Sequence, residues 1–233
     1  MGATTAGVRQ TALIALLVAI AAGCGNDSNA GNSPSNDQVE ETSGATTLPP
    51  CTTNRRAVAF EIVGALMDDD EGFNAWVADN TQTPRARMGA ADLTNTYAAK
   101  GYEIIYFTLA PNNLPIGDVL IGDALNQWLD ANGFARGPRT RLFAPNPDHA
   151  GRSDLPAIGI SDELVRERSQ GVIVDFAYGN SEDKILAFQT GGVPAANVFS
   201  LGDAAGTNGS QAVSGDDLVA HSATVDALPK VCE

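Results

Sequence analysis

Basic residues are scarce in this sequence. It has 14 Lys and Arg against 28 Asp and Glu, which gives a formal net charge of -14. Such a balance disfavours nucleic acid and anionic membrane surfaces as partners of the folded part. The acidic residues are dispersed, which is typical of the solvated surface of a soluble domain, and we expect no nucleic-acid partner.

Histidine is rarer still. The two histidines, His149 and His221, stand apart and have no ligand spacing around them, so we interpret both as solvent-facing loop residues. The sequence also shows no Ser-His-Asp arrangement, zinc-ligand spacing, phosphate-binding loop or internal repeat. These absences disfavour the enzyme classes that depend on such motifs.

The apolar segment of residues 11–22 is too short to span a bilayer. Arg9 precedes it, and the small residues Ala21, Ala22 and Gly23 lead directly to Cys24, as in a targeting segment. This ending resembles the lipobox of bacterial lipoproteins, in which the cysteine is diacylated and becomes the first residue. We therefore predict a lipoprotein signal peptide at residues 1–24; the alternative is an ordinary signal peptide that is cut nearby.

Large apolar residues are nearly missing from residues 25–51, which are rich in Ser, Asn, Gly, Thr and Pro. Such a segment cannot bury enough surface to order itself, so we interpret it as a disordered linker. Acyl chains on Cys24 would bind a membrane with about 0.8 kcal/mol per buried methylene. The predicted location is the bacterial cell envelope, lipid-anchored and facing the periplasm or the exterior, with the folded domain at residues 52–233.

Only three cysteines are present. If Cys24 carries lipid, Cys51 and Cys232 remain at the two ends of the domain, and an exported protein meets an oxidising compartment. A disulfide between them would close a loop of 181 residues (232 minus 51). The chain-entropy model gives about 5 kcal/mol for a loop of that size. The alternative is two free thiols.

Short apolar runs alternate with helical patterns after residue 55, and this alternation predicts the fold class. Strands connected by helices need crossovers, which give a parallel sheet, and right-handed crossovers give a doubly wound α/β sandwich.

Residues 68–71 are four consecutive acidic residues, which we interpret as a surface loop, with a cation site as the alternative. Residues 203–233 are polar and Gly-rich, and we interpret them as a C-terminal segment that returns the chain to the domain and has Cys232 next to its end. Strands are predicted from residue 56 and at 102–108, 139–143, 172–178 and 197–201, and helices at 84–100, 121–133, 161–171 and 181–190.

Residues 60–66, Phe-Glu-Ile-Val-Gly-Ala-Leu, resemble the first motif of the haloacid dehalogenase superfamily in its lipin-type (phosphatidate phosphatase) branch, Phe-Asp-Ile-Asp-Gly-Thr-Leu. Residues 100–111, 126–134, 177–185 and 191–201 are similar to further motifs of that branch, in the same order. The resemblance covers roughly residues 55–202. It implies a doubly wound parallel sheet sandwiched by helices, the haloacid-dehalogenase-like Rossmannoid fold.

The same resemblance indicates that the reaction is lost. In working relatives the first aspartate attacks phosphorus, the second is the acid and base, and Mg²⁺ is held beside them. Here these positions are Glu61 and Val63, and Lys184 replaces an aspartate of the metal site. A displacement of about 1 Å costs about a hundredfold in rate, and loss of acid-base help costs about 10² to 10⁴. We therefore expect no intact catalytic residue and no cofactor; Mg²⁺ belongs only to the alternative of an active phosphatase.

The resemblance places a ligand at the carboxyl end of the sheet. Glu61 and Asn180 are vestigial metal positions, and the Lys184 ammonium is predicted to lie near Glu61 in place of the Mg²⁺ charge, with a solvent-facing Lys184 as the alternative. Thr108 and Asn180 have structural alternatives as a backbone cap and a turn residue. The candidate ligand-binding residues are Thr108, Gly64, Ala65, Asn180 and Lys184.

The partner classes are also carried over from the family. The related C-terminal domains of phosphatidylinositol transfer proteins lack the nucleophile and bind phosphatidic acid. We therefore predict an inactive, membrane-anchored domain that binds a phosphorylated small molecule, a phospholipid or a protein partner. The alternatives are a Mg²⁺-dependent phosphatase of the phosphatidate phosphatase type and a structural surface lipoprotein.

Overall fold

The computed structural model describes residues 55–68, 70–146, 155–215, 217–228 and 230–231. The predicted signal peptide and linker lie outside these residues, as do Cys24, Cys51, Cys232 and His149. Lipidation and the disulfide therefore stay predictions. Within the described part of the chain, no helix is both long and apolar enough to cross a membrane.

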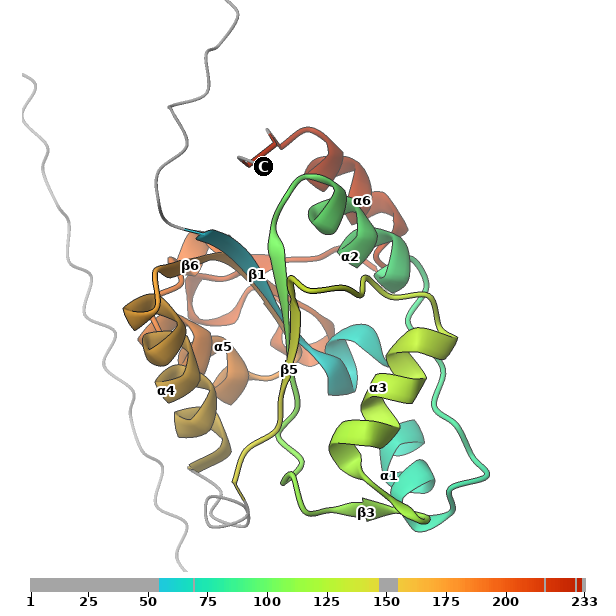
Figure 1. The fold of residues 1–233 in the computed structure, drawn as a ribbon. Coiled ribbons are helices and arrows are strands. Elements are labelled where there is room, and N and C mark those ends of the chain that lie inside the picture. The colour runs from blue at the N-terminus through green and yellow to red at the C-terminus, as the bar shows by residue number, and fades with distance from the viewer. Residues whose placement is uncertain (1–54, 69, 147–154, 216, 229, 232–233) are drawn as a thin grey trace, which may run out of the picture. The chain divides into compact units, whose positions relative to one another are not determined.

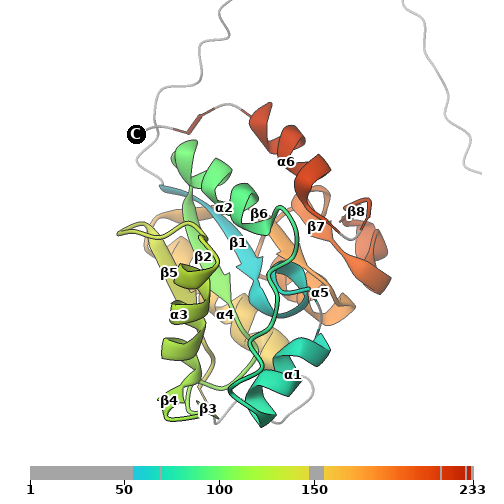
Figure 2. The same ribbon diagram turned by 90° about the vertical axis from the view of Figure 1, so that its right-hand side faces the viewer.

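A six-stranded sheet with the order β5-β2-β1-β6-β7-β8 forms the centre of the domain (Figures 1 and 2). Every neighbouring pair in it is parallel, so the predicted α/β fold with a parallel sheet is confirmed. The strands are β1 (Arg55–Glu61), β2 (Glu103–Phe107), β5 (Thr140–Phe143), β6 (Val172–Gly179), β7 (Val198–Ser200) and β8 (Gln211–Ala212).

Helices cover both faces of the sheet, because successive residues of a strand point to opposite sides. On β1, Val58 and Phe60 belong to the larger apolar core, and Ala57 and Ala59 to the smaller one. The larger core contains side chains of α1 (Asp70–Ala78), α2 (Ala90–Ala99), α3 (Ile121–Ala131) and α6 (Val219–Asp226), and the smaller one those of α4 (Leu155–Ser169) and α5 (Glu182–Thr190).

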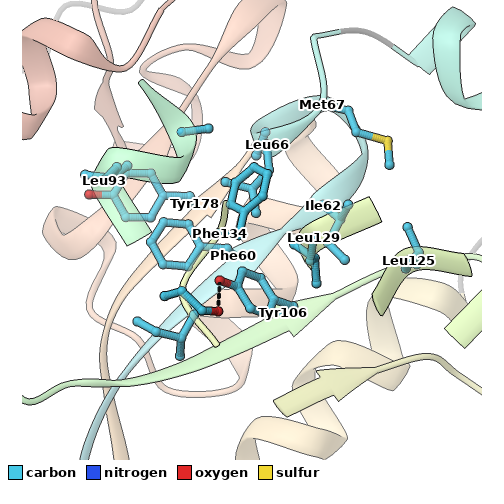
Figure 3. Packing of buried hydrophobic residues seen from close by; sticks show 14 of the residues in the cluster. Phe60, Ile62, Leu66, Met67, Leu93, Tyr106, Leu125, Leu129, Phe134 and Tyr178 are labelled. Atoms are coloured by element: carbon cyan, nitrogen blue, oxygen red, sulfur yellow. Dashed lines mark hydrogen bonds between the residues drawn. The ribbon is translucent and has the colours of Figure 1, made fainter. Parts of the chain in front are cut away.

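Aromatic rings fill the larger core around Phe60 (Figure 3). The ring of Phe60 stacks on that of Tyr178 with a centroid distance of 4.8 Å, and its edge meets Tyr97 at 5.9 Å. The hydroxyl of Tyr106 donates a hydrogen bond to the carbonyl oxygen of Ala135 at 2.9 Å. This pairing satisfies the one polar atom that the ring carries into the core.

Shorter elements complete the chain. A hairpin of β3 (Pro115–Ile116) and β4 (Val119–Leu120) precedes α3, and a single wide turn, η1 (Ile62–Leu66), follows β1. The remaining turns are η3 (Ala195–Asn197), η4 (Gly202–Ala204) and η5 (Thr207–Gly209).

Two predicted helix starts are wrong. The segment after Pro84 is not helical: the amide of Arg87 donates to the carbonyl of Leu66 at 2.7 Å, and a bridge pairs Met67 with Ala86. This segment therefore runs against the end of η1, and Gly89, with φ 78°, turns the chain into α2 at residue 90. α4 begins at residue 155 rather than at Ser161.

The acidic loop and the C-terminal return are also more ordered than expected. Asp70 and Glu71 form the first turn of α1, where carboxylates stabilise the helix dipole, and this helix buries Phe73 and Trp76. The segment after residue 203 contains β8 and α6. α6 packs beside α2, and the ammonium of Lys100 donates to the carbonyl oxygens of Asp226, the last residue of α6, and of Leu228, at 2.8 Å each.

Candidate functional site

The candidate site begins where β1 ends and the chain turns sharply. Val63 is extended and Gly64 has φ 90°, a region that residues with a side chain rarely adopt. A Cβ at Gly64 would lie 1.7 Å from Nδ2 of Asn180, so glycine is required there on two counts. The turn therefore brings the end of β1 into contact with the residue that follows β6.

Lys184 lies at the centre of this arrangement. Its Nζ is 2.9 Å from Oε1 of Glu61, and it donates hydrogen bonds to Oδ1 of Asn180 at 2.6 Å and to the carbonyl oxygen of Val63 at 3.2 Å. The predicted proximity of Lys184 to Glu61 is confirmed, and the solvent-facing alternative is wrong, since Lys184 is only 7% exposed. The spacing explains the reach: Asn180 precedes α5, and Lys184 lies four residues later in its first turn.

Glu61 is completely buried. Burial raises its pKa to about 7, although the Lys184 ammonium partly opposes this by lowering it, and Asp70 raises it further. Neither Oε1 nor Oε2 accepts a well-aligned hydrogen bond from the residues that the structure describes, although the backbone amide of Ala65 also lowers the pKa of Glu61. The carboxyl group is therefore held mainly by its ion pair with Lys184, in a buried environment.

Thr108 follows β2, next to the end of β1, because Phe107 and Glu61 are partners in the sheet register. The hydroxyl oxygen of Thr108 accepts a hydrogen bond from the Ala110 amide at 3.1 Å. This is the capping role that the sequence left open as an alternative. The hydroxyl hydrogen can still be donated to a ligand.

A family model described as the LNS2 domain of PITM 1-3 matches residues 58–202, which is more than half of the chain. The chain belongs to the LNS2 domain family. The match runs from β1 to the end of β7, and so includes Glu61, Thr108 and Lys184. No curated protein matches the chain at a significant level.

Solved structures resemble the LNS2 domain at low identity. One in the Pnkp1/Rnl/Hen1 RNA repair complex has a TM-score of 0.46 and 15% identity, over 63% of this chain and 43% of its own, so this chain spans less than half of it. An apo phosphoserine phosphatase has a TM-score of 0.43 and 10% identity, over 70% and 96%. A cobalt-bound deoxy-D-mannose-octulosonate 8-phosphate phosphatase from Haemophilus influenzae has a TM-score of 0.45 and 12% identity, over 74% and 90%.

Mg²⁺, which the family resemblance implies, does not fit this LNS2 site. The oxygens around Lys184 are a carboxylate, a backbone carbonyl and a side-chain amide, all suitable for a hard cation. The point between them is occupied by the Lys184 ammonium. Among the residues that the structure describes, no group of three or more His, Cys, Asp or Glu could hold a metal ion.

Arg87 is a site residue that the sequence analysis missed. It is buried, and its guanidinium donates to the carbonyl oxygens of Gly64 at 2.9 Å, Ala65 at 3.1 Å and Asp68 at 2.8 Å. These contacts fix the turn that shapes the LNS2 site. Arg87 has no motif around it, so no sequence signal separates it from the neighbouring Arg85.

His221 was expected in a solvent-facing loop, and this is wrong. It lies in α6, where its Nε2 is 2.8 Å from the hydroxyl of Tyr178, which in turn is 2.9 Å from the hydroxyl of Tyr97. Burial lowers the pKa of His221 and raises that of Tyr178. A neutral imidazole therefore shares a hydrogen bond with the Tyr178 hydroxyl, in which the donor depends on the ring tautomer, and α6 is tied to the centre of the sheet.

Proposed function

We propose that this protein is a non-catalytic LNS2 domain, held at the bacterial cell envelope by lipid on Cys24, that binds a phosphorylated ligand. The observation that carries the proposal is the buried ion pair between Glu61 and Lys184. It concerns the position where the family resemblance implies a free nucleophilic carboxylate beside a metal ion.

Three features of the site oppose phosphoryl transfer. Glu61 is engaged by an ammonium and is buried, so its carboxylate is not presented to a phosphorus atom. Val63, at the position of the general acid, has no proton to transfer. Phosphoryl transfer depends on positioning and on cationic stabilisation of the transferred group. The charge of Lys184 is already compensated by Glu61.

Ligand binding is supported by where these residues lie. Ligands of parallel α/β sheets bind outside the carboxyl ends of the strands, and Gly64, Thr108 and Asn180 all follow such ends. The ligand class, a phosphorylated small molecule or a phospholipid, is the one that the family resemblance supplies. Because Lys184 is buried and contacts Glu61, Asn180 and Val63, we assign recognition to Thr108 and backbone amides of the turns.

Activity is tested with the purified domain and Mg²⁺, using p-nitrophenyl phosphate and phosphatidic acid as substrates. We expect no turnover above the blank. Turnover that is abolished both by EDTA and by Glu61→Ala would overturn the proposal in favour of an active phosphatase.

Binding is tested separately by thermal unfolding with inorganic phosphate, glycerol 3-phosphate, or vesicles with and without phosphatidic acid. A specific ligand raises the melting temperature by mass action. Stabilisation by the free phosphates indicates a soluble ligand, and stabilisation by phosphatidic acid vesicles alone indicates a lipid. We expect Thr108→Val to weaken either effect; no effect of any of these probes would contradict the ligand part.

Anchoring is tested in cells. We expect the full-length protein to fractionate with membranes, and Cys24→Ser to release it or to block its processing, because acyl chains supply the membrane affinity. An unmodified Cys24 in the mature protein, measured by mass spectrometry, would refute the anchor.

A further inference from the structure

We infer that the Lys184 ammonium is a resident cation of this LNS2 domain, which occupies the place of a divalent metal ion and makes the site independent of metals. This inference concerns the same site as the proposed function but does not depend on ligand binding or on the absence of turnover.

The oxygens around Nζ of Lys184 are of the kinds that bind cations. Glu61 provides a carboxylate oxygen at 2.9 Å, Asn180 an amide oxygen at 2.6 Å, and Val63 a backbone carbonyl oxygen at 3.2 Å. Glu61 and Val63 lie at the end of β1 and in the turn directly after it, and Asn180 follows β6. Three polar oxygens from two segments far apart in the sequence converge on one point, which is the arrangement of a cation site.

The ammonium of Lys184 is engaged on every side by protein oxygens. Of its three N–H donors, it donates to Asn180 and Val63, and its charge faces Oε1 of Glu61 at 2.9 Å. Lys184 is therefore committed to groups of the protein rather than to a ligand oxygen or a metal-bound water. A divalent ion at this point would also lie within contact distance of a positive charge, which Coulomb repulsion forbids.

The ammonium of Lys184 also balances the charge of Glu61. A buried lone carboxylate is costly to keep ionised, and Lys184 supplies one positive charge for the one negative charge of Glu61. The pair also joins the first turn of α5 to the end of β1, as a metal ion would join them. Removing the ammonium should therefore leave both a structural gap and an uncompensated carboxylate.

The experiment exchanges the internal cation for an external one. Thermal unfolding of the wild type, Lys184→Ala and Lys100→Ala is measured in Mg²⁺, in Mn²⁺, and in KCl of the same ionic strength. Lys100 is the matched control, because its ammonium also binds carbonyl oxygens, at 2.8 Å from the Asp226 and Leu228 carbonyls, and forms no ion pair with a carboxylate among the residues that the structure describes.

We expect the wild type not to respond to either divalent ion. Lys184→Ala should melt at a lower temperature in KCl and regain roughly 2 to 4 °C in Mg²⁺ or Mn²⁺. Calorimetric titration should detect one divalent site in this variant alone, and Lys100→Ala should not be rescued.

Two results would overturn the inference. One is saturable Mg²⁺ or Mn²⁺ binding by the wild type. The other is a Lys184→Ala variant that neither ion stabilises, or, if this variant unfolds in KCl, whose refolded yield neither ion raises. Neither result bears on phosphate or phospholipid binding, so the failure of this inference and that of the proposed function are distinguishable.

Discussion

The Lys184 ammonium and the Glu61 carboxylate lie 2.9 Å apart, both almost fully inside the domain. Breaking a buried pair by removing one partner is costly, because the remaining charge has no compensation. Replacing both partners together can cost much less. The free-energy cost of substituting both residues should therefore be smaller than the sum of the costs of the two single substitutions.

We predict that Lys184→Met destabilises the domain by about 3 kcal/mol at pH 8. Loss of the ammonium that lowers the Glu61 pKa leaves the buried carboxyl group either ionised without a partner or protonated at a further raised pKa. Glu61→Gln should cost less, since an amide oxygen still faces the ammonium. Urea unfolding of both single variants and the double variant gives the coupling energy, expected at about 1 to 3 kcal/mol.

A matched pair on the opposite end of β1 serves as the control. Arg56 and Asp175 form an ion pair in which Arg56 is 41% exposed at the side chain. Its coupling energy should be smaller, because exposed pairs contribute about 0 to 1 kcal/mol. Equal coupling at the two pairs would contradict the importance that we assign to burial at Glu61.

Gly64→Ala should destabilise the domain by more than about 2 kcal/mol. The methyl group meets the Asn180 amide, and the backbone there has φ 90°. Gly171→Ala is the control, because Gly171 has φ 81° but nothing within 4 Å of an added Cβ. Urea unfolding should give only the backbone cost at Gly171, about 1 kcal/mol, and equal losses at both positions would contradict a tight contact at Gly64.

The sequence predicted the parts of the fold that periodicity and motifs encode. The apolar strands and the Gly-terminated helices were found because burial and helix ends leave local patterns. The contact between Lys184 and Glu61 was predictable because both positions lie in recognisable motifs. Arg87 and His221 were not, because their roles depend on partners far along the chain, such as Gly64 and Tyr178, that no local pattern identifies.

Arg87 supports the turn after β1, and we predict that Arg87→Lys costs about 2 kcal/mol. Lysine keeps the charge but cannot reach the carbonyls of Gly64, Ala65 and Asp68 together, as the guanidinium does. Hydrogen exchange at the amides of residues 64–68 should speed up. Arg85→Lys, at an exposed position of the same segment, should change stability by less than about 0.5 kcal/mol; an equal effect at both would refute this role.

We predict that His221 makes the domain less stable as the pH falls. Its pKa in the folded domain is lowered by burial, while in the unfolded chain it is about 6.5. Below pH 6.5 the unfolded chain therefore binds a proton that the folded domain refuses, and stability falls as the pH falls. Glu61 acts in the opposite sense: its folded pKa of about 7 lies above its ordinary 4.5, so its contribution falls as the pH rises between these values.

The two opposing contributions are separated by comparing the wild type with His221→Gln. The glutamine amide can accept or donate the hydrogen bond with Tyr178 but does not titrate, while Glu61 and every other group are shared and cancel in the difference. Urea unfolding between pH 8 and pH 5 should show the wild type losing stability relative to the variant below about pH 6.5. The slope should be a fraction of about 1.4 kcal/mol per pH unit, because a half-buried ring keeps part of its hydration. Parallel curves across this range would show that protonation of His221 leaves α6 in place.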